Sequence, residues 1–253
     1  MLIRIFRAAK TPMTAAALCL GFGLFVVPAS AAPAGCPAPS GPYRLDQAEP
    51  LNLGQLKLVL REYRCLRYDG EVAAVLGQAQ KWVEQRAPQV DKPAVVLDID
   101  ETSLSNWEQI FHNDFGYIGG GPCDLASKAA CGNYAWEQSA AAPAIEPTLA
   151  LFKAAKAKNV AVFFINGRYD DGEKKSATEL NLKRAGYADW DGLYLRDPKA
   201  PRASVAEYKR DARLDIERKG YTIIANIGDQ DSDLAFGHAE LTFKVPNPFY
   251  FIP

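Results

Sequence analysis

Two patterns of apolar residues alternate along most of the chain. A short, wholly apolar run at 94–97 is typical of a strand buried on both faces. Similar, largely apolar runs occur at 160–165, 193–195, 221–227 and, more weakly, 241–245. Helical spacing lies between them, at about 147–158, 173–185, 203–219 and in a short stretch after Asp231. Strands that alternate with helices predict an α/β fold with a parallel sheet and helices on both of its faces.

A helical pattern also precedes the first apolar run, from Leu51 to about Arg86. We expect a break at Gly70, because the apolar positions fall on one face in each of two segments. These positions are Leu53, Leu56, Leu60 and Tyr63, and then Val72, Val75, Leu76 and Ala79. The resulting division is a signal peptide at 1–31, an arm and helices at 32–92, and a core at 93–253 with a small cap at about 103–146.

The N-terminal segment has the form of an export signal. Arg4, Arg7 and Lys10 precede an apolar run at 15–27 that is short for a membrane span. Ala29-Ser30-Ala31 has the small residues that a signal peptidase needs, so we expect cleavage after Ala31 and a periplasmic or secreted protein. The alternative is an uncleaved anchor. A lipid attached at Cys36 is disfavoured, because the apolar residue expected three places earlier is missing.

Charge and cysteine content narrow the class of partner and compartment. Cleavage would remove three basic residues and no acidic ones, so the formal net charge would move from −1 to −4. A mildly acidic protein does not hold a nucleic acid polymer or an anionic membrane by bulk charge. Four cysteines would remain, and we favour disulfides Cys36–Cys65 and Cys123–Cys131 on sequence proximity. A zinc site is the alternative, but the paired CxxC spacing is missing.

Acidic residues follow two of the predicted strands. Asp98 and Asp100 come at the end of the first strand, spaced so that both side chains point to the same side. Two crowded carboxylates need a bound cation or a shared proton, although a lone pair of this kind can also be a solvated turn. A second cluster, which includes Asp229 and Asp233, follows Gly228 at the end of the fourth strand. Together the clusters predict an oxygen-rich Mg²⁺ site, since ligands bind at the carboxyl edge of such sheets.

Groups that could bind an anion follow the second strand and lie on the third helix of the core. The Asn166 amide, the Gly167 backbone N–H and Arg168 would form a small phosphate cradle. Lys209 could turn into the cleft and neutralise phosphate charge. Its basic neighbours suit a solvated helix face equally well, so the spacing by itself does not single Lys209 out. These neighbours are Arg202, Arg210, Arg213, Arg218 and Lys219.

These motifs occur in an order that resembles the haloacid dehalogenase (HAD) superfamily: DIDET, FFINGR, YKRDAR and GDQDSDL, within residues 50–245. The chain is most similar to the subfamily IIIB branch, with plant acid phosphatases, vegetative storage proteins and bacterial class B-like and lipoprotein acid phosphatases. The resemblance implies a Rossmann-like three-layer sheet with a cap after the first strand. It also implies a phosphatase that acts on phosphate monoesters.

The resemblance further implies a role for each matching residue. Asp98 matches the nucleophile that forms an aspartyl-phosphate, and Asp100 matches the general acid/base. Lys209 matches the lysine that holds the nucleophile and the phosphoryl group. Mg²⁺ would be bound by the Asp98 side chain, the Asp100 carbonyl and Asp229, with Asp233 directly or through water. Asn166 stands where the family usually has Ser or Thr, so we expect retained activity with altered efficiency.

Aromatic residues are concentrated in the predicted cap. They could form a wall that stacks an aromatic leaving group, or they could be the core of the cap itself. They are Trp107, Phe111, Tyr117, Tyr134 and Trp136. His112 and His238 lack partners at metal or triad spacing, so we interpret both as structural.

Three functions fit this sequence. The first is an exported, Mg²⁺-dependent acid phosphatase for small phosphate monoesters. The second is a non-catalytic storage or binding protein on the same scaffold, which the intact acidic residues and Lys209 disfavour. The third is a phosphotransferase that passes the phosphoryl group to an alcohol.

Overall fold

The computed structural model describes residues 51–200 and 204–252. In this part of the chain, five parallel strands form a sheet in the order β3-β2-β1-β4-β5. The strands are β1 Pro93–Leu97, β2 Ala161–Tyr169, β3 Gly192–Arg196, β4 Thr222–Gly228 and β5 Leu241–Lys244. The predicted α/β class is therefore confirmed. From β1, the strands β2 and β3 are added on one side and β4 and β5 on the other. The carboxyl end of β1 is therefore the topological switch point of the sheet, where ligands bind in folds of this kind.

Helices fill the gaps between the strands; α5 to α8 were predicted from the sequence, whereas α3 and α4 in the cap were not. Those after β1 are α3 Trp107–His112, α4 Asn133–Ser139, α5 Glu146–Ala157, α6 Glu173–Arg184, α7 Val205–Arg218 and α8 Asp231–Leu234. Helix α7 begins at a capping box, in which the Ser204 hydroxyl accepts from the Glu207 N–H and the Glu207 carboxylate accepts from the Ser204 N–H.

The expected break at Gly70 is wrong. Helix α1, Leu53–Tyr63, continues through a π-helical turn, Arg64–Tyr68, into α2, Asp69–Arg86, which ends in the 3₁₀ turn Ala87–Gln89. Gly70 lies in the first turn of α2, where an added Cβ would meet no atom within 4 Å. A glycine in a helix costs only about 1 kcal/mol relative to alanine. The packing of α2 on the sheet outweighs that cost, and the change of face comes from the π turn.

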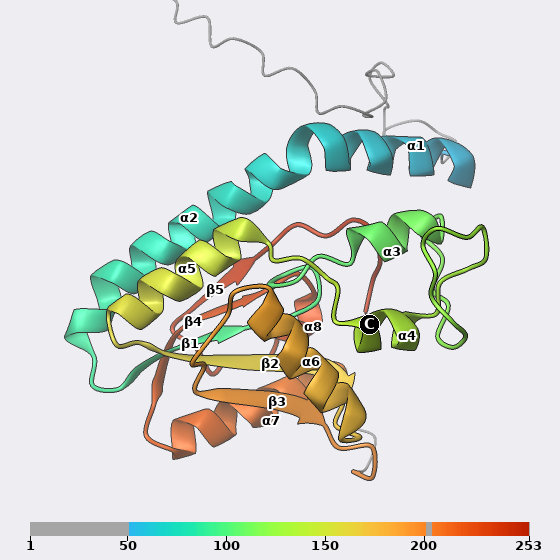
Figure 1. Cartoon of the computed structure of the whole chain (residues 1–253). Coiled ribbons are helices and arrows are strands. Elements are labelled where there is room, and N and C mark those ends of the chain that lie inside the picture. The colour runs from blue at the N-terminus through green and yellow to red at the C-terminus, as the bar shows by residue number, and fades with distance from the viewer. Residues whose placement is uncertain (1–50, 201–203, 253) are drawn as a thin grey trace, which may run out of the picture. The chain divides into compact units, whose positions relative to one another are not determined.

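Alternate residues of the central strands pack on opposite faces of the sheet. Val95 and Leu97 of β1 face the larger core cluster, which includes buried residues of α2 and α5. Figure 1 shows these two helices side by side along that face. Ala94 and Val96 face the smaller cluster, which includes Ala212 and Ile216 of α7 on the opposite face. Packing on both faces explains why the strands are apolar without alternation.

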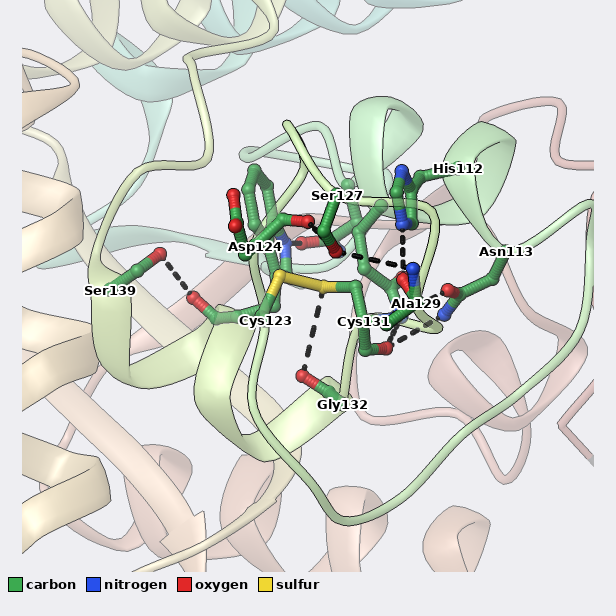
Figure 2. Close-up of a disulfide and its surroundings, with 12 residues drawn as sticks. His112, Asn113, Cys123, Asp124, Ser127, Ala129, Cys131, Gly132 and Ser139 are labelled. Carbon is green, nitrogen blue, oxygen red and sulfur yellow. Dashed lines mark hydrogen bonds between the residues drawn. A yellow bond between two sulfur atoms is a disulfide. The ribbon is translucent and has the colours of Figure 1, made fainter.

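The segment between β1 and α5, here called the cap segment, carries α3, α4 and a disulfide loop. The predicted Cys123–Cys131 disulfide is confirmed, and Figure 2 shows how the loop is attached to α3. Asn113 donates to the Cys131 carbonyl at 2.8 Å and accepts from the Cys131 N–H at 2.8 Å. His112 Nε2 bonds the Ala129 carbonyl at 2.7 Å, in keeping with a structural role.

Several expectations fall on residues outside the described part of the chain. These are the signal peptide at 1–31, the arm at 32–49 and the Cys36–Cys65 pairing. Among the described residues, no helix combines the length and the apolar character that a membrane span requires.

Candidate active site

The two acidic clusters meet at the carboxyl edge of the sheet. Asp98 follows β1 and its N–H donates to the Ile227 carbonyl of β4 at 2.9 Å, which ties the two strand ends together. Asp98, Asp229 and Asp233 are buried, and each offers a carboxylate oxygen within 4.8 Å of the others. Three carboxylates at this spacing form a hard, anionic donor set that fits Mg²⁺. Lys244 Nζ and Asn247 Nδ2 bond Asp229 from the outside, at its carbonyl and its carboxylate.

Lys209 projects from α7 into this cluster. Its Nζ lies 2.5 Å from Asp98 Oδ1 and 2.5 Å from Asp233 Oδ1, and the side chain is almost fully buried. Burial by itself would lower the pKa of Lys209, but the Asp98 and Asp233 carboxylates raise it above its usual value. The lysine is therefore held as a cation beside the predicted nucleophile. This contact separates Lys209 from its basic neighbours, which sequence spacing could not do.

Arg213, one of those neighbours, does not lie on a solvated face. It is fully buried, and its guanidinium donates to three backbone carbonyls, those of Asp233 at 2.7 Å, Gly237 at 2.9 Å and Ala235. The Asp233 carbonyl lies in the last turn of the short helix α8 and the other two follow that helix, so none of them has a helical partner. Arg213 thus holds the C-terminal end of α8, which carries Asp233.

Burial and repulsion between carboxylates raise the pKa values of Asp98 and Asp229. The pKa of Asp98 lies well above its usual value because of burial, against which Lys209 acts, and because of Asp233 and Asp229. Burial and the Asp233 charge raise the pKa of Asp229 to about 6. A carboxylate cluster under this strain is stabilised by a cation, which is consistent with a metal site.

Asp100 has a different environment from Asp98. Arg168 donates to both of its oxygens, at 2.6 Å and 3.1 Å, while Asn106 Nδ2 donates at 2.8 Å and Asn166 Nδ2 at 3.0 Å. Burial by itself would raise the pKa of Asp100, but the Arg168 charge and these hydrogen bonds bring it below its usual value. The two carboxylates of this motif therefore differ in proton affinity, with the pKa of Asp98 raised and that of Asp100 lowered. This is the reverse of the order that a nucleophile at Asp98 and a general acid at Asp100 require.

The three residues of the predicted phosphate cradle all line the cavity above Asp98. The Asn166 amide bridges the two motif carboxylates, because Nδ2 also lies 3.3 Å from Asp98 Oδ1 while Oδ1 accepts from the Arg168 N–H. The Arg168 side chain points to Asp100 and to Thr178 Oγ1, and it lies 3.8 Å from Glu137. In the structure the Arg168 side chain therefore bonds Asp100, the candidate acid/base. A contact between Arg168 and phosphate stays a prediction.

A cavity of about 280 Å³ is lined by Asp98 and Asp100, and a second of about 490 Å³ shares Asp100 among its lining residues. The cap segment and residues 249–252 form the walls of the second cavity. Among the cap aromatics, Tyr117 and Tyr134 line the first cavity. Trp136 is buried in the larger core cluster, and the half-buried Trp107 packs against that cluster. Phe111 packs on Trp107 at 5.4 Å but is 47% exposed.

Four residues at the site were missed by the sequence analysis: Glu101, Asn106, Glu137 and Tyr250. Glu101 lies next to Asp100 within the first motif, and burial together with the Asp100 and Asp229 charges raises its pKa to about 8. Its position next to Asp100 in the motif could have identified Glu101 as a site residue. Asn106 follows the motif closely and could have been noted, whereas Glu137 and Tyr250 reach the site only through the fold of the cap segment and of residues 245–252.

Comparison with known proteins identifies the family. The sequence profile described as HAD superfamily, subfamily IIIB (acid phosphatase) matches residues 55–253. The chain belongs to this family. The predicted resemblance is thus confirmed for the superfamily and for the branch.

Individual relatives in this family are plant proteins. The chain is 42% identical over 120 residues to the stem 28 kDa glycoprotein of Glycine max, which covers 46% of this chain and 46% of that protein. It is 30% identical over 158 residues to acid phosphatase 1 of Solanum lycopersicum, covering 62% of this chain and 58% of that protein. Vegetative storage protein 1 of Arabidopsis thaliana is 29% identical over 159 residues, covering 62% and 55%. The matches thus span about half the length of these relatives.

A solved structure confirms the fold. The class C acid phosphatase from Bacillus anthracis superposes with a TM-score of 0.60 at 21% identity, covering 79% of this chain and 87% of that chain. At this identity the likeness concerns the fold, and the site must be argued from the residues of this chain.

Proposed function

We propose that this protein is an exported, Mg²⁺-dependent phosphatase that hydrolyses small phosphate monoesters through an aspartyl-phosphate on Asp98. The observation that carries the proposal is the contact of Lys209 Nζ with Asp98 and Asp233, within a cluster of three carboxylates. Lys209 is a buried cation beside Asp98, and the three carboxylates form a site for a metal cation beside the same residue. Positive charge from both would neutralise an incoming phosphate, which is the main requirement of phosphoryl transfer.

In the first step, an Asp98 oxygen attacks the phosphorus as the bond from phosphorus to the leaving oxygen breaks. Asp100 gives its proton to that oxygen, so the alcohol leaves neutral. In the second step, water attacks the phosphorus, Asp100 takes up the proton of the water, and the Asp98 carboxylate is released. Mg²⁺ held by Asp98, the Asp100 carbonyl, Asp229 and Asp233 would neutralise charge on the phosphoryl oxygens.

The remaining residues of the cavity bind and orient the phosphoryl group. Lys209 stays charged between its two carboxylates and can donate to a phosphoryl oxygen as well as to Asp98. Asn166 bridges Asp98 and Asp100 in the structure, and a phosphoryl oxygen can compete for its amide. Because a carboxamide is longer than a hydroxyl, we expect Asn166 to reduce efficiency without abolishing activity.

Export is supported by two features of the chain. One is the signal-like sequence of residues 1–31. The other is the Cys123–Cys131 disulfide, since structural disulfides persist in oxidising compartments.

The alternative is a storage or binding protein, and relatives described as vegetative storage proteins give it some support. A phosphotransferase uses the same first step with an alcohol in place of water. The buried contact of Lys209 with Asp98, and the Asn166 amide that joins Asp98 to Asp100, favour an enzyme over a binding protein.

The deciding experiment measures phosphate release from an aryl phosphate at acidic pH. We expect turnover with Mg²⁺, loss of turnover with a chelator, and a fall of roughly 10⁴-fold or more in Asp98→Asn. Asp98→Asn should also be folded, as judged by thermal unfolding. No turnover on a panel of phosphate monoesters would reject the enzyme, and phosphoryl transfer to added glycerol would identify a phosphotransferase.

A further inference from the structure

The side chain of Asn106 forms hydrogen bonds with Asp100 and with two further residues. It is buried, with an exposed fraction of 8%. Its Nδ2 donates to Asp100 Oδ1 at 2.8 Å and to Glu101 Oε2 at 3.1 Å, and its Oδ1 accepts from Trp136 Nε1 at 2.8 Å. Both amide hydrogens and the amide oxygen are therefore used, which leaves the side chain no free rotation.

Trp136 decides which way the Asn106 amide faces. An indole N–H can only donate, so the group opposite it must be the amide oxygen. The NH₂ group of Asn106 is thereby directed at the two carboxylates. Without the indole N–H, the amide could turn over, and its oxygen would then face Asp100 and Glu101.

Glu101 fixes Asn106 from the other side. Its Oε1 accepts from the Asn106 backbone N–H at 2.5 Å, and its Oε2 also accepts from the Tyr250 hydroxyl at 2.8 Å. Main chain and side chain of Asn106 are thus held by one carboxyl group. These hydrogen bonds fix the direction from which Asn106 Nδ2 donates to Asp100.

Trp136 in turn belongs to the cap segment. It lies on α4, its backbone N–H donates to the Gly132 carbonyl at 3.0 Å, and the residue is 4% exposed within the larger core cluster. Gly132 follows Cys131 of the disulfide. The position of Asp100 is therefore connected to helix α4 through two hydrogen bonds, from Trp136 to Asn106 and from Asn106 to Asp100.

Asn106 differs from the other donors to Asp100. Arg168 supplies charge, and Asn166 also contacts Asp98. Asn106 is neutral and makes no contact with Asp98 among the hydrogen bonds of the described chain. Asn106 therefore fixes the direction of the Asp100 carboxyl through one hydrogen bond, which also helps to lower the pKa of that carboxyl.

We propose that Asn106 and Trp136 are positioning residues that aim the Asp100 carboxyl at the oxygen of the leaving group. The inference rests on the proposed function, in which Asp100 donates a proton to that oxygen. An alkyl alcohol leaves slowly as an alkoxide and depends on this proton, whereas nitrophenolate leaves without it. A misoriented Asp100 carboxyl should therefore slow the hydrolysis of alkyl phosphates far more than that of nitrophenyl phosphate.

The test compares kcat/KM for glycerol phosphate and 4-nitrophenyl phosphate in Trp136→Phe. This variant keeps a buried ring and removes the N–H. We expect kcat/KM for glycerol phosphate to fall roughly 10-fold or more, since positioned general acids contribute about 10²–10⁴-fold. For 4-nitrophenyl phosphate we expect a change below about 3-fold. Asn106→Ala, the second variant, should show the same selective loss.

Trp82→Phe is the matched control. Trp82 is half-buried on α2 and its Nε1 donates to the Ile224 carbonyl at 2.7 Å, so this variant also removes one indole hydrogen bond. We expect its ratio of the two kcat/KM values to equal that of the wild type. Equal losses on both substrates in Trp136→Phe and Asn106→Ala, or no loss at all, would overturn the inference. A wild-type protein without turnover would instead reject the proposed phosphatase, which is a separate outcome.

Discussion

Gly228 and Asp233 are packed so closely that no side chain fits between them. A Cβ atom at Gly228 would lie 2.3 Å from Asp233 Cβ and 2.4 Å from Asp233 Oδ2. Carbon atoms in contact normally stand about 3.5–4.0 Å apart. The absent side chain lets Asp233 fold back over the end of β4, where its Oδ2 accepts from the Gln230 N–H at 2.8 Å and its Oδ1 meets Lys209.

Gly228→Ala should therefore displace Asp233 from the carboxylate cluster. We expect the rise in unfolding temperature on adding Mg²⁺ to shrink, and phosphatase activity to fall by about 10²-fold or more, since a 1 Å misplacement can cost that much. The control is Gly77→Ala in α2, where an added Cβ meets nothing within 4 Å. It should gain about 0.5–1 kcal/mol in stability. Unchanged metal binding in Gly228→Ala would contradict the interpretation.

Replacing Lys209 with methionine should destabilise the protein and increase its dependence on metal. Removal of one partner from a buried ion pair costs about 3–5 kcal/mol, because the remaining charges are left uncompensated. Bound Mg²⁺ would restore positive charge beside Asp98 and Asp233. Thermal unfolding with Mg²⁺ and with chelator should show a larger difference for Lys209→Met than for the wild type.

Lys219→Met tests whether this effect is specific to the buried pair. Lys219 follows the same helix, and its pair with Asp215 is about half exposed on both sides. We expect its stability to change by less than about 1 kcal/mol. Its response to Mg²⁺ should equal that of the wild type.

Gly132→Ala should loosen the cap segment around the disulfide. An added Cβ would lie 2.2 Å from the Gly121 carbonyl oxygen and 2.8 Å from that of Gly120, so the backbone of one loop would have to move. Overpacking of this kind costs about 1–3 kcal/mol. Reduction of Cys123–Cys131 by a mild thiol, followed by alkylation, should be faster than in the wild type. Gly120→Ala is the control in the same segment, because its added Cβ meets no atom within 4 Å; equal rates in both variants would argue against the contact.

Asp114→Asn should reduce stability at neutral pH and leave it unchanged in acid. Lys57 and Arg61 of α1 lie 2.6 Å and 2.8 Å from the Asp114 carboxylate in the cap segment. The hydrogen bond from Lys57 and the two positive charges lower the pKa of Asp114, against a smaller opposing effect of burial. A lowered pKa in the folded state adds stability above about pH 4, the unfolded value, and this stability is lost as the pH falls through the folded value.

The measurement compares unfolding of the two proteins between about pH 3 and pH 7. Asparagine tolerates the positive φ of 49° at this position, so backbone strain does not confuse the comparison. The difference between the two proteins should also shrink at high salt. A difference that is independent of pH would show that the ion pairs are not its cause.

The succession of elements could be predicted because it depends on local periodicity. Each apolar run became a strand, and each amphipathic stretch between runs became a helix. Local periodicity wrongly predicted a break at Gly70. The π turn at Arg64–Tyr68 shifts the apolar positions to another face of a continuous helix, and no residue type in the sequence marks this turn. Strand order, β3-β2-β1-β4-β5, depends on contacts between residues far apart in sequence and is not written in any one segment.

The sequence by itself determined the chemistry available to this protein: carboxylates after β1 and β4, an amide after β2, and a choice of cations on α7. Only the tertiary structure decided which cation contacts Asp98, because Lys209 and Arg213 differ little in sequence context, yet Lys209 bonds Asp98 and Arg213 bonds backbone carbonyls. It also decided that Trp136 bonds Asn106 behind Asp100. The reason is physical: residue type fixes what a side chain can donate or accept, whereas burial and distance, which require the fold, fix the partner.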